Sequence, residues 1–330
     1  MAVPQPAMIV PREITHSTLH LPHKPSASIH YTFTKNSSSD RILVVFLNGL
    51  MSDKTSWIPV IAGIIRQRQG TGAGFPSMLA YDRYGQGMTS DRDPQDEGKE
   101  PGHGHDCASA AEDLHHLVQQ VAKEQMNLDC AELRMILVAN SIGCAIARLY
   151  AHAHPVTALL FLDSIMANSN FDLWPDPDLP LRPEDIGDVT VDELKEQRAK
   201  FAAIFHPFVI NKEGLSRQNL AELLPFSDRP AIGGKGNRPW LTVVGHDFDA
   251  FAQESLRTMG TPIFLSMKYS NPVWHAYNQG LIKLTEEDRR KGPIQAKGCG
   301  HFIQRDDPNF VVDETLDLVD KVRMEQSAVW

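Results

Sequence analysis

Short, continuously apolar segments alternate with helical patterns along this chain, and this alternation constrains the fold more than any other feature. A strand that is buried on both faces of a sheet is apolar at nearly every residue. Helical spacing of apolar residues follows Cys107, and again follows Ser141 until Pro155. Strand then helix, repeated, predicts a parallel α/β sheet. The six segments that fit this pattern best are residues 42–47, 78–81, 135–139, 159–162, 240–244 and 293–296.

Two segments near the start have a different pattern. Residues 14–21 and 26–34 alternate polar and apolar side chains. A strand with one face in water shows this alternation, typically in antiparallel sheets. We therefore expect an antiparallel pair at one edge of the sheet.

The chain between the fourth and fifth parallel strands is too long for a simple crossover. Seventy-four residues separate Ser164 from Pro239, whereas a crossover with its helix needs only about a dozen. Thr190 and Glu193 have the spacing of a capping box, which predicts a helix, and a second helical stretch is expected at 215–224. Prolines at 175–183 and a glycine-rich run at 230–237 flank these helices. We expect a helical cap at 165–238, inserted between core segments 1–164 and 239–330.

Composition narrows the classes of partner. The chain has 41 acidic and 32 basic residues, a formal charge of -9, and no run of Lys or Arg longer than the three at 289–291, which argues against nucleic acid or an anionic membrane surface. No apolar stretch approaches the roughly 20 residues that span a bilayer, and residues 1–16 lack a signal-type hydrophobic segment. We expect a cytoplasmic protein that binds a small molecule, with a homodimer left open. The four cysteines and the H-x-H-D at 103–106 lack a metal-site spacing, so no metal or cofactor is expected.

The segment Ala139-Asn140-Ser141-Ile142-Gly143 joins an apolar strand directly to a helix. A tight turn with Ser at its apex, between strand and helix, is a nucleophile elbow, for which the usual pattern is G-x-S-x-G. Such a turn exposes the hydroxyl and directs the N–H of Ile142 and the helix N-terminus toward a developing oxyanion. Ala139 replaces the first glycine. The alternative is a serine that only caps the helix.

Two further loops complete a candidate active site. His301 lies in a glycine-flanked loop after the last strand, and an imidazole with a pKa of about 6.5 accepts and returns protons near neutral pH. The order nucleophile, acid, histidine is that of the α/β hydrolases. Asn48, Gly49 and Leu50 follow the first parallel strand, where the N–H of Leu50 would be a second oxyanion donor and Gly49 permits a sharp turn.

Taken together, these residues make the chain resemble the cap-bearing serine hydrolase branch of the α/β-hydrolase superfamily, from about Ile14 to the C-terminal helix. The resemblance implies an α/β fold with a mostly parallel eight-stranded sheet, helices on both faces and an inserted helical cap. Asn48, where the family usually has His, and Ala139 depart from its pattern. The matching motifs are LNGL at 47–50, YDRYGQGMTSDRD at 81–93, ANSIG at 139–143, FLDS at 161–164, VVGHD at 243–247 and GCGHFIQRDDP at 298–308.

The resemblance also assigns roles. It implies Ser141 as the nucleophile, His301 as the general base, and the N–H groups of Leu50 and Ile142 as the oxyanion hole. The acid that orients the imidazole is expected to be Asp247, at the end of VVGHD. Asp163 and Asp249 remain alternatives for it.

Serine at position 141 favours acyl chemistry, because relatives that open epoxides or displace halide need a carboxylate there. We expect a cofactor-free hydrolase of the carboxylesterase or lactonase type, acting on an apolar or aromatic ester or lactone, with Asn48 and Trp174 among the residues that contact substrate. The alternatives are a carbon–carbon bond hydrolase or lyase with the same triad, and a ligand-binding protein without turnover. The substrate class rests on aromatic residues in and around the insert: Phe171, Trp174, Phe201, Phe205, Phe208, Phe226 and Trp274.

Overall fold

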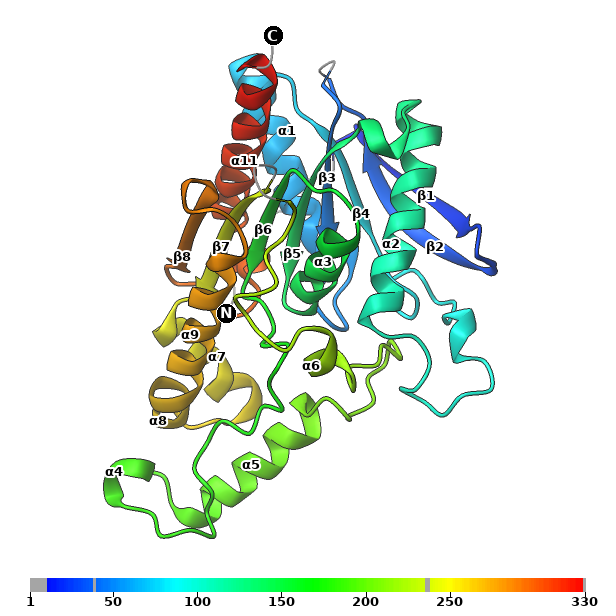
Figure 1. The fold of residues 1–330 in the computed structure, drawn as a ribbon. Helices are drawn as coiled ribbons and strands as arrows, with labels where there is room; N and C mark the ends of the chain where they lie inside the picture. Colours follow the sequence, from blue (N-terminus) through cyan, green and yellow to red (C-terminus); the bar gives the residue numbers. More distant parts are fainter. Residues whose placement is uncertain (1–10, 38–39, 235–237, 329–330) are drawn as a thin grey trace, which may run out of the picture.

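A computed structural model, which describes residues 11–37, 40–234 and 238–328, contains an eight-stranded sheet (Figure 1). The strand order is β1-β2-β4-β3-β5-β6-β7-β8. β1 and β2 are antiparallel to their neighbours, and every pairing from β4 to β8 is parallel. The predicted fold class is confirmed. The strands are β1 (Ile14–Leu21), β2 (Lys24–Thr34), β3 (Ile42–Leu47), β4 (Ser77–Tyr81), β5 (Arg134–Asn140), β6 (Ala158–Leu162), β7 (Trp240–His246) and β8 (Arg290–Ala296).

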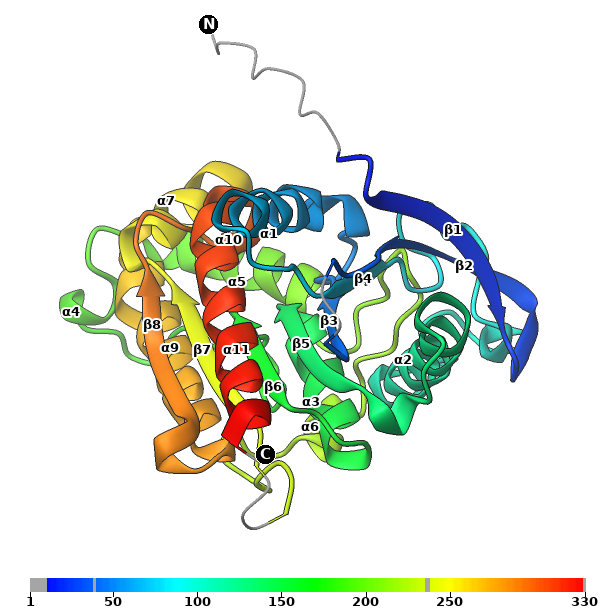
Figure 2. The same cartoon turned by 90° about the horizontal axis from the view of Figure 1, so that it is seen from above.

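Helices cover both faces of the sheet (Figure 2). α1 and α11 pack on one face, while α2, α3 and α9 pack on the other. Every residue of β3 is buried, with Val44 facing one helical layer and Val45 the other. Burial on both faces is why the central strands are continuously apolar. The helices outside the insert are α1 (Ile58–Thr71), α2 (Cys107–Val121), α3 (Ile142–Ala153), α7 (Phe248–Met259), α8 (Ile263–Leu265), α9 (Asn271–Leu281), α10 (Ile303–Asp306) and α11 (Pro308–Ala328).

Single turns of 3₁₀ or π helix connect several of these elements. They are η1 (Lys54–Trp57), η2 (Pro94–Asp96), η3 (Ala122–Met126), η4 (Cys130–Glu132), η5 (Ser266–Ser270), η6 (Ile282–Leu284) and η7 (Glu287–Arg289).

The long segment between β6 and β7 contains α4 (Pro183–Ile186), α5 (Val191–Phe205) and α6 (Leu220–Leu223). α4 and α5 extend away from the sheet, at the bottom of the view in Figure 1. The predicted capping box begins α5: the Thr190 hydroxyl accepts from the Glu193 N–H at 3.2 Å, and the Glu193 carboxylate accepts from the Thr190 N–H at 2.8 Å. The prediction of a helix that starts after Thr190 is confirmed.

The second helix expected in this segment, at 215–224, is wrong for most of its length, because only α6 forms there. The preceding residues bond to other parts of the molecule. The N–H of Ser216 donates to the carbonyl of His105 at 2.8 Å. The Arg217 guanidinium donates to the carbonyls of Phe205 and His206, each at 3.2 Å. Of the glycine-rich run at 230–237, residues 235–237 lie outside the described part of the chain.

Candidate active site

Ser141 forms the turn between β5 and α3. Its backbone has φ 56° and ψ −122°, a conformation that non-glycine residues rarely adopt and that is typical of strained functional turns. Hydrogen bonds hold it: the Ser141 N–H donates to the Leu162 carbonyl at 3.1 Å, and the Ser141 carbonyl accepts from Ile165 at 3.2 Å. The half-buried serine therefore has the backbone geometry of the predicted elbow.

Gly143 allows α3 to lie close to the loop after β3. A Cβ at this position would be 2.6 Å from the carbonyl oxygen of Leu47 and 2.9 Å from that of Asn48. Both contacts are with backbone, which cannot rotate away as a side chain can. The glycine two residues after the serine is therefore required by packing, and it brings the two expected oxyanion-hole segments together.

His301 lies at the same edge of the sheet as Ser141. Its carbonyl accepts a hydrogen bond from the side chain of Asn140, the residue before Ser141, at 3.0 Å. Its N–H donates to the Glu254 carboxylate at 2.9 Å. Its ring meets Trp274 edge to face, with 5.6 Å between ring centres. The structure thus places His301 at the same sheet edge as Ser141, although 160 residues separate them in the sequence.

The carboxylate beside His301 belongs to Asp163, at the end of β6, and the prediction of Asp247 in this place is wrong. His301 Nδ1 donates to Asp163 Oδ2 at 2.6 Å. Asp247 is instead the N-cap of α7, which begins one residue later. Its carboxylate accepts from the N–H groups of Asp249 at 3.0 Å, Ala250 at 3.1 Å and Gly298 at 3.1 Å. Asp163 was one of the alternatives left open by the sequence.

Asp163 is fully buried between two imidazoles. Its second oxygen, Oδ1, accepts from His246 Nδ1 at 2.8 Å. Burial alone raises the pKa of this carboxyl, but the charge and hydrogen bonds of His246 and the hydrogen bond of His301 outweigh burial and lower the pKa to about 2. Asp163 is therefore ionised throughout the neutral and mildly acidic range.

His246, at the end of β7, is a site residue that the sequence did not reveal. Its Nε2 is 3.1 Å from Asn271 Oδ1, and the Asn271 amide nitrogen donates to the Phe248 carbonyl at 3.1 Å. That bond fixes the amide, so its oxygen must accept from His246, and Asp163 accepts from the other ring nitrogen. Burial lowers the pKa of His246, but Asp163 and Asn271 outweigh burial and raise it. Because an acceptor faces each ring nitrogen, the site favours the doubly protonated, cationic form of His246.

Replacing His246 with asparagine keeps a donor toward Asp163 but removes the charge. At pH 5.5 we expect the free energy of unfolding to fall by about 1.5–3 kcal/mol, the usual contribution of a hydrogen bond to a charged group. Because the folded-state pKa is raised, this stabilisation is complete below the ordinary histidine value of about 6.5 and is lost as pH rises through the folded-state value. Urea unfolding of both proteins from pH 5.5 to 9 should show a difference that shrinks with pH.

The exposed His16, replaced with asparagine, is the control, and its effect should be small at every pH. A His246→Asn difference that stays constant or grows toward pH 9 would contradict a cationic His246.

One expected oxyanion donor belongs to the elbow, and the other to the loop after β3 that contacts it. Ile142 is the first residue of α3, so its N–H has no partner within the helix. Leu50 follows β3 in a loop that contacts the elbow, since a Cβ on Gly49 would be 3.3 Å from Ser141 Cβ. Within the described residues, the Leu50 N–H makes no hydrogen bond. Both N–H groups are thus free to bind an oxyanion.

Asn48 does not face a substrate pocket, contrary to the prediction. Its side chain is 1% exposed. Its amide nitrogen donates to the Tyr81 carbonyl at 2.8 Å and to Gln86 at 3.2 Å, and its oxygen accepts from the Trp57 indole at 2.9 Å. Asn48 therefore holds the loop after β3 to β4 and η1.

An aromatic cluster continues from His301 into the insert. Trp274, beside His301, is followed by Phe171 at 6.2 Å between ring centres, then Phe201 at 6.3 Å. Trp174 packs on Phe201 at 4.8 Å, and its indole donates to Ser270 at 3.1 Å. Four of the seven predicted aromatic residues are therefore buried in this cluster, whereas Phe208 and Phe226 are exposed.

Two cavities adjoin the insert. Phe171, Trp174 and Phe201 border one of about 330 Å³. A larger groove of about 720 Å³ runs from Met166, next to the residue bonded to Ser141, between the insert and α9. Side chains that border this groove include Asn168, Phe208, Gln218, Val273, Ala276 and Tyr277.

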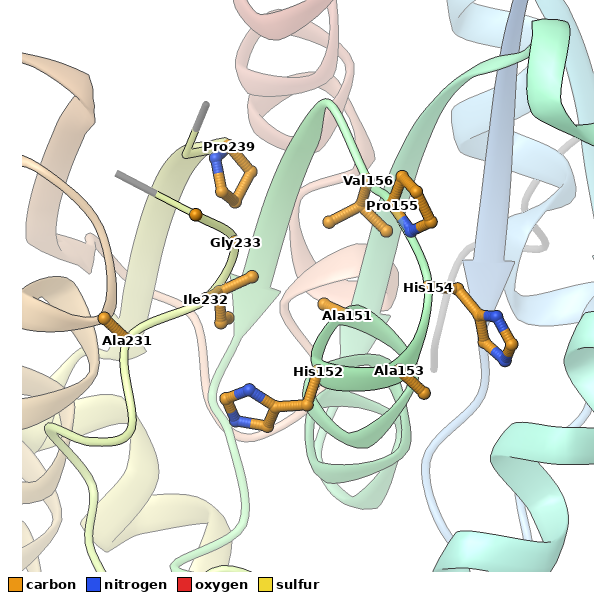
Figure 3. A pocket seen from close by; sticks show the side chains of 11 residues that line it. Ala151, His152, Ala153, His154, Pro155, Val156, Ala231, Ile232, Gly233 and Pro239 are labelled. Atoms are coloured by element: carbon orange, nitrogen blue, oxygen red, sulfur yellow. The ribbon is translucent and has the colours of Figure 1, made fainter. Parts of the chain in front are cut away.

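A third pocket, of about 390 Å³, lies elsewhere (Figure 3). His152, Pro155, Ile232 and Pro239 border it, at the C-terminal end of α3. Ser141 is at the other end of this helix, about 18 Å away at 1.5 Å per residue. This pocket is therefore separate from the candidate active site.

The part of the chain that the structure describes contains neither a metal-binding cluster nor a helix that could span a membrane. There, no three His, Cys, Asp or Glu side chains come together in a way that could hold a metal ion. Of the H-x-H-D residues, His105 pairs with Asp96 at 2.9 Å and Asp106 caps α2. None of the described helices is both long and apolar enough to cross a bilayer.

Comparisons with known proteins agree with this fold. Residues 44–314 match the family model described as "Alpha/beta hydrolase family". No curated protein sequence matches the chain significantly.

Three similar solved structures share 13–14% identity with this chain, so they support the fold alone. A haloalkane dehalogenase loop variant from Bradyrhizobium elkanii has a TM-score of 0.56, 14% identity, and coverage of 96% of this chain and 100% of that one. An epoxide hydrolase from potato (Solanum tuberosum) has a TM-score of 0.56 and 14% identity, and the match covers 93% of this chain and 99% of that one. A putative lipase from Acinetobacter baumannii AYE has a TM-score of 0.51 and 13% identity, and the match covers 95% of this chain and 93% of that one.

Proposed function

This chain belongs to the alpha/beta hydrolase family, and from that premise we propose that it is a serine hydrolase that cleaves an ester or lactone of an apolar or aromatic small molecule. The observation that carries the proposal is the strained turn at Ser141, at the same sheet edge as the His301–Asp163 pair. A serine that only capped α3 would need neither feature. Its side chain in fact makes no capping hydrogen bond.

The proposed reaction uses five groups. Ser141 Oγ attacks the carbonyl carbon while His301 Nε2 takes the hydroxyl proton, because Asp163 holds the hydrogen on Nδ1. The N–H groups of Leu50 and Ile142 donate to the oxyanion. The alcohol leaves with the proton from His301, and water, activated by the same imidazole, releases the acid from the acyl-serine.

The nucleophile distinguishes this proposal from the activities named for the structural neighbours. Opening an epoxide or displacing a halide requires a carboxylate that forms an ester intermediate. This chain has Ser141 at that point of the fold. A hydroxyl favours transfer of an acyl group, as in ester hydrolysis.

The surroundings of His301 support an apolar or aromatic substrate. Trp274 contacts its ring, and Phe171 and Phe201 continue the apolar surface into the insert. Farther from His301, the groove of about 720 Å³ bordered by Met166 and Tyr277 has the volume of a pocket for a drug-sized ligand.

Labelling with an aryl fluorophosphonate tests the proposal. The activated serine oxygen should displace fluoride and form a stable bond to phosphorus. Mass spectrometry of the digested protein should find one adduct, on the peptide that contains Ser141. Hydrolysis of p-nitrophenyl esters should disappear in proportion to labelling.

The Ser141→Ala protein is the control and should take up no label. An adduct on another residue that accounts for the lost activity would overturn the mechanism. Full ester hydrolysis by a completely labelled protein would do the same.

A further inference from the structure

The loop that carries the second oxyanion donor is held by a buried carboxylate from the insert, Glu213. This side chain is 1% exposed. It lies 50 residues beyond Asp163 along the chain, yet it reaches the loop after β3. It takes no part in the proposed proton transfers, so its burial needs another reason.

Glu213 accepts from three donors around that loop. Arg83 pairs with it at 3.0 Å, Gln86 donates to it at 2.8 Å, and the N–H of Met51 donates to it directly. Arg83 and Gln86 are themselves buried. The insert thus supplies the negative charge that a buried guanidinium requires.

Arg83 and Gln86 in turn hydrogen-bond to the backbone of the loop after β3, which carries the Leu50 N–H. Arg83 donates to the carbonyls of Asn48 at 2.8 Å and Gly49 at 3.1 Å, and Gln86 donates to the Gly49 carbonyl at 2.9 Å. The Gly49 carbonyl and the Leu50 N–H belong to one planar trans peptide, so they point in opposite directions. Fixing the carbonyl therefore fixes the direction of the N–H.

We infer that Glu213 is a positioning residue for the oxyanion hole: through Arg83, Gln86 and the Met51 N–H it directs the Leu50 N–H to the space beside Ser141. The inference rests on the proposed serine hydrolase function. Gly49 contacts the elbow, since a Cβ there would be 3.3 Å from Ser141 Cβ. The insert therefore helps to build the catalytic geometry as well as to bind substrate.

Hydrogen bonds keep the Glu213 segment in place. Arg92 donates to the Lys212 carbonyl at 2.6 Å, and Asn219 donates to Asp106 at 2.6 Å. Gly85 permits the approach, because a Cβ there would be 2.7 Å from the Glu213 carbonyl oxygen. The carboxylate is therefore presented from a docked segment.

The test compares Glu213→Gln with the wild type. We expect kcat for p-nitrophenyl esters to fall about 100-fold with KM within about threefold, because loss of one oxyanion donor costs about 10²–10³ in kcat. An alkyl boronic acid, whose tetrahedral adduct with Ser141 places an oxygen in the hole, should bind more weakly by a similar factor. A loosened fold alone would not produce these matched changes.

Glu314→Gln is the matched control, because Glu314 is a buried carboxylate of α11 paired with Lys291 at 2.7 Å. It should keep kcat and boronate affinity within about threefold. Gln86→Met removes a donor to the Gly49 carbonyl but keeps the Arg83–Glu213 pair, and it should lower kcat about tenfold. If Glu213→Gln does not fold, this variant tests whether the loop after β3 must be held for catalysis.

The possible failures can be told apart. A wild type that neither hydrolyses esters nor takes up phosphonate at Ser141 would overturn the proposed function and this inference with it. If the wild type does both, the inference is overturned when kcat is within threefold in Glu213→Gln, or in Gln86→Met where Glu213→Gln does not fold. An equal loss in Glu314→Gln would also overturn it.

Discussion

Replacing Ser141 with alanine is expected to lower kcat/KM for a p-nitrophenyl ester by at least about 10⁴-fold, the scale seen when the nucleophile of a triad is removed. The fold should persist, since the elbow depends on backbone bonds from Leu162 and Ile165 and on Gly143. Steady-state kinetics and the affinity for a product acid measure the two effects separately. Catalysis should fall while ground-state binding stays within a few fold.

Ser164→Ala is a control at the same sheet edge. The Ser164 hydroxyl already donates to the Ile165 carbonyl at 3.0 Å, so its loss should leave kcat/KM within about tenfold. Unchanged hydrolysis in Ser141→Ala would remove the nucleophile from the mechanism. Tight binding without turnover in the wild type would instead favour a ligand-binding protein on this fold.

The central strands were predictable because a strand buried on both faces is apolar at consecutive positions of the sequence. Residues of β3 are apolar throughout since both sides of the strand are covered. The turn at Ser141 was predictable for a similar reason, because strand, serine and helix follow one another without interruption. Periodicity failed at 215–224, where the apolar spacing of a helix is present but Ser216 and Arg217 bond to other segments.

The contacts that complete the site depend on distant parts of the chain. Asp163 meets His246 across 83 residues and His301 across 138. Arg83 meets Glu213 across 130. No local pattern encodes such pairs. The motif VVGHD correctly marked the end of β7. Its aspartate, Asp247, caps α7 instead of pairing with His301, and the preceding residue, His246, contacts Asp163.

Replacing Asp163 with asparagine is expected to lower kcat about 10⁴-fold, as does the equivalent change in a serine protease triad, while Asp247→Asn should lower it less than tenfold. An asparagine at 163 that turns its amide nitrogen toward His301 Nδ1 forces the proton onto Nε2, which then cannot accept from Ser141. Among the described residues, the Asp247 carboxylate accepts hydrogen bonds only from backbone N–H groups. Its loss should cost about 1 kcal/mol of stability through a weakened cap of α7.

Stability must be measured beside kcat, because Asp163 also neutralises His246. Breaking a buried ion pair costs about 3–5 kcal/mol, so Asp163→Asn is expected to unfold at lower urea concentration. Assays at a temperature where circular dichroism shows both variants folded remove this contribution. The double variant Asp163→Asn/His246→Asn should recover stability, because no unpaired cation remains, yet its kcat should stay low. A double variant that regained catalysis, or an Asp247→Asn protein as impaired as Asp163→Asn, would show that the acid of the triad is not Asp163.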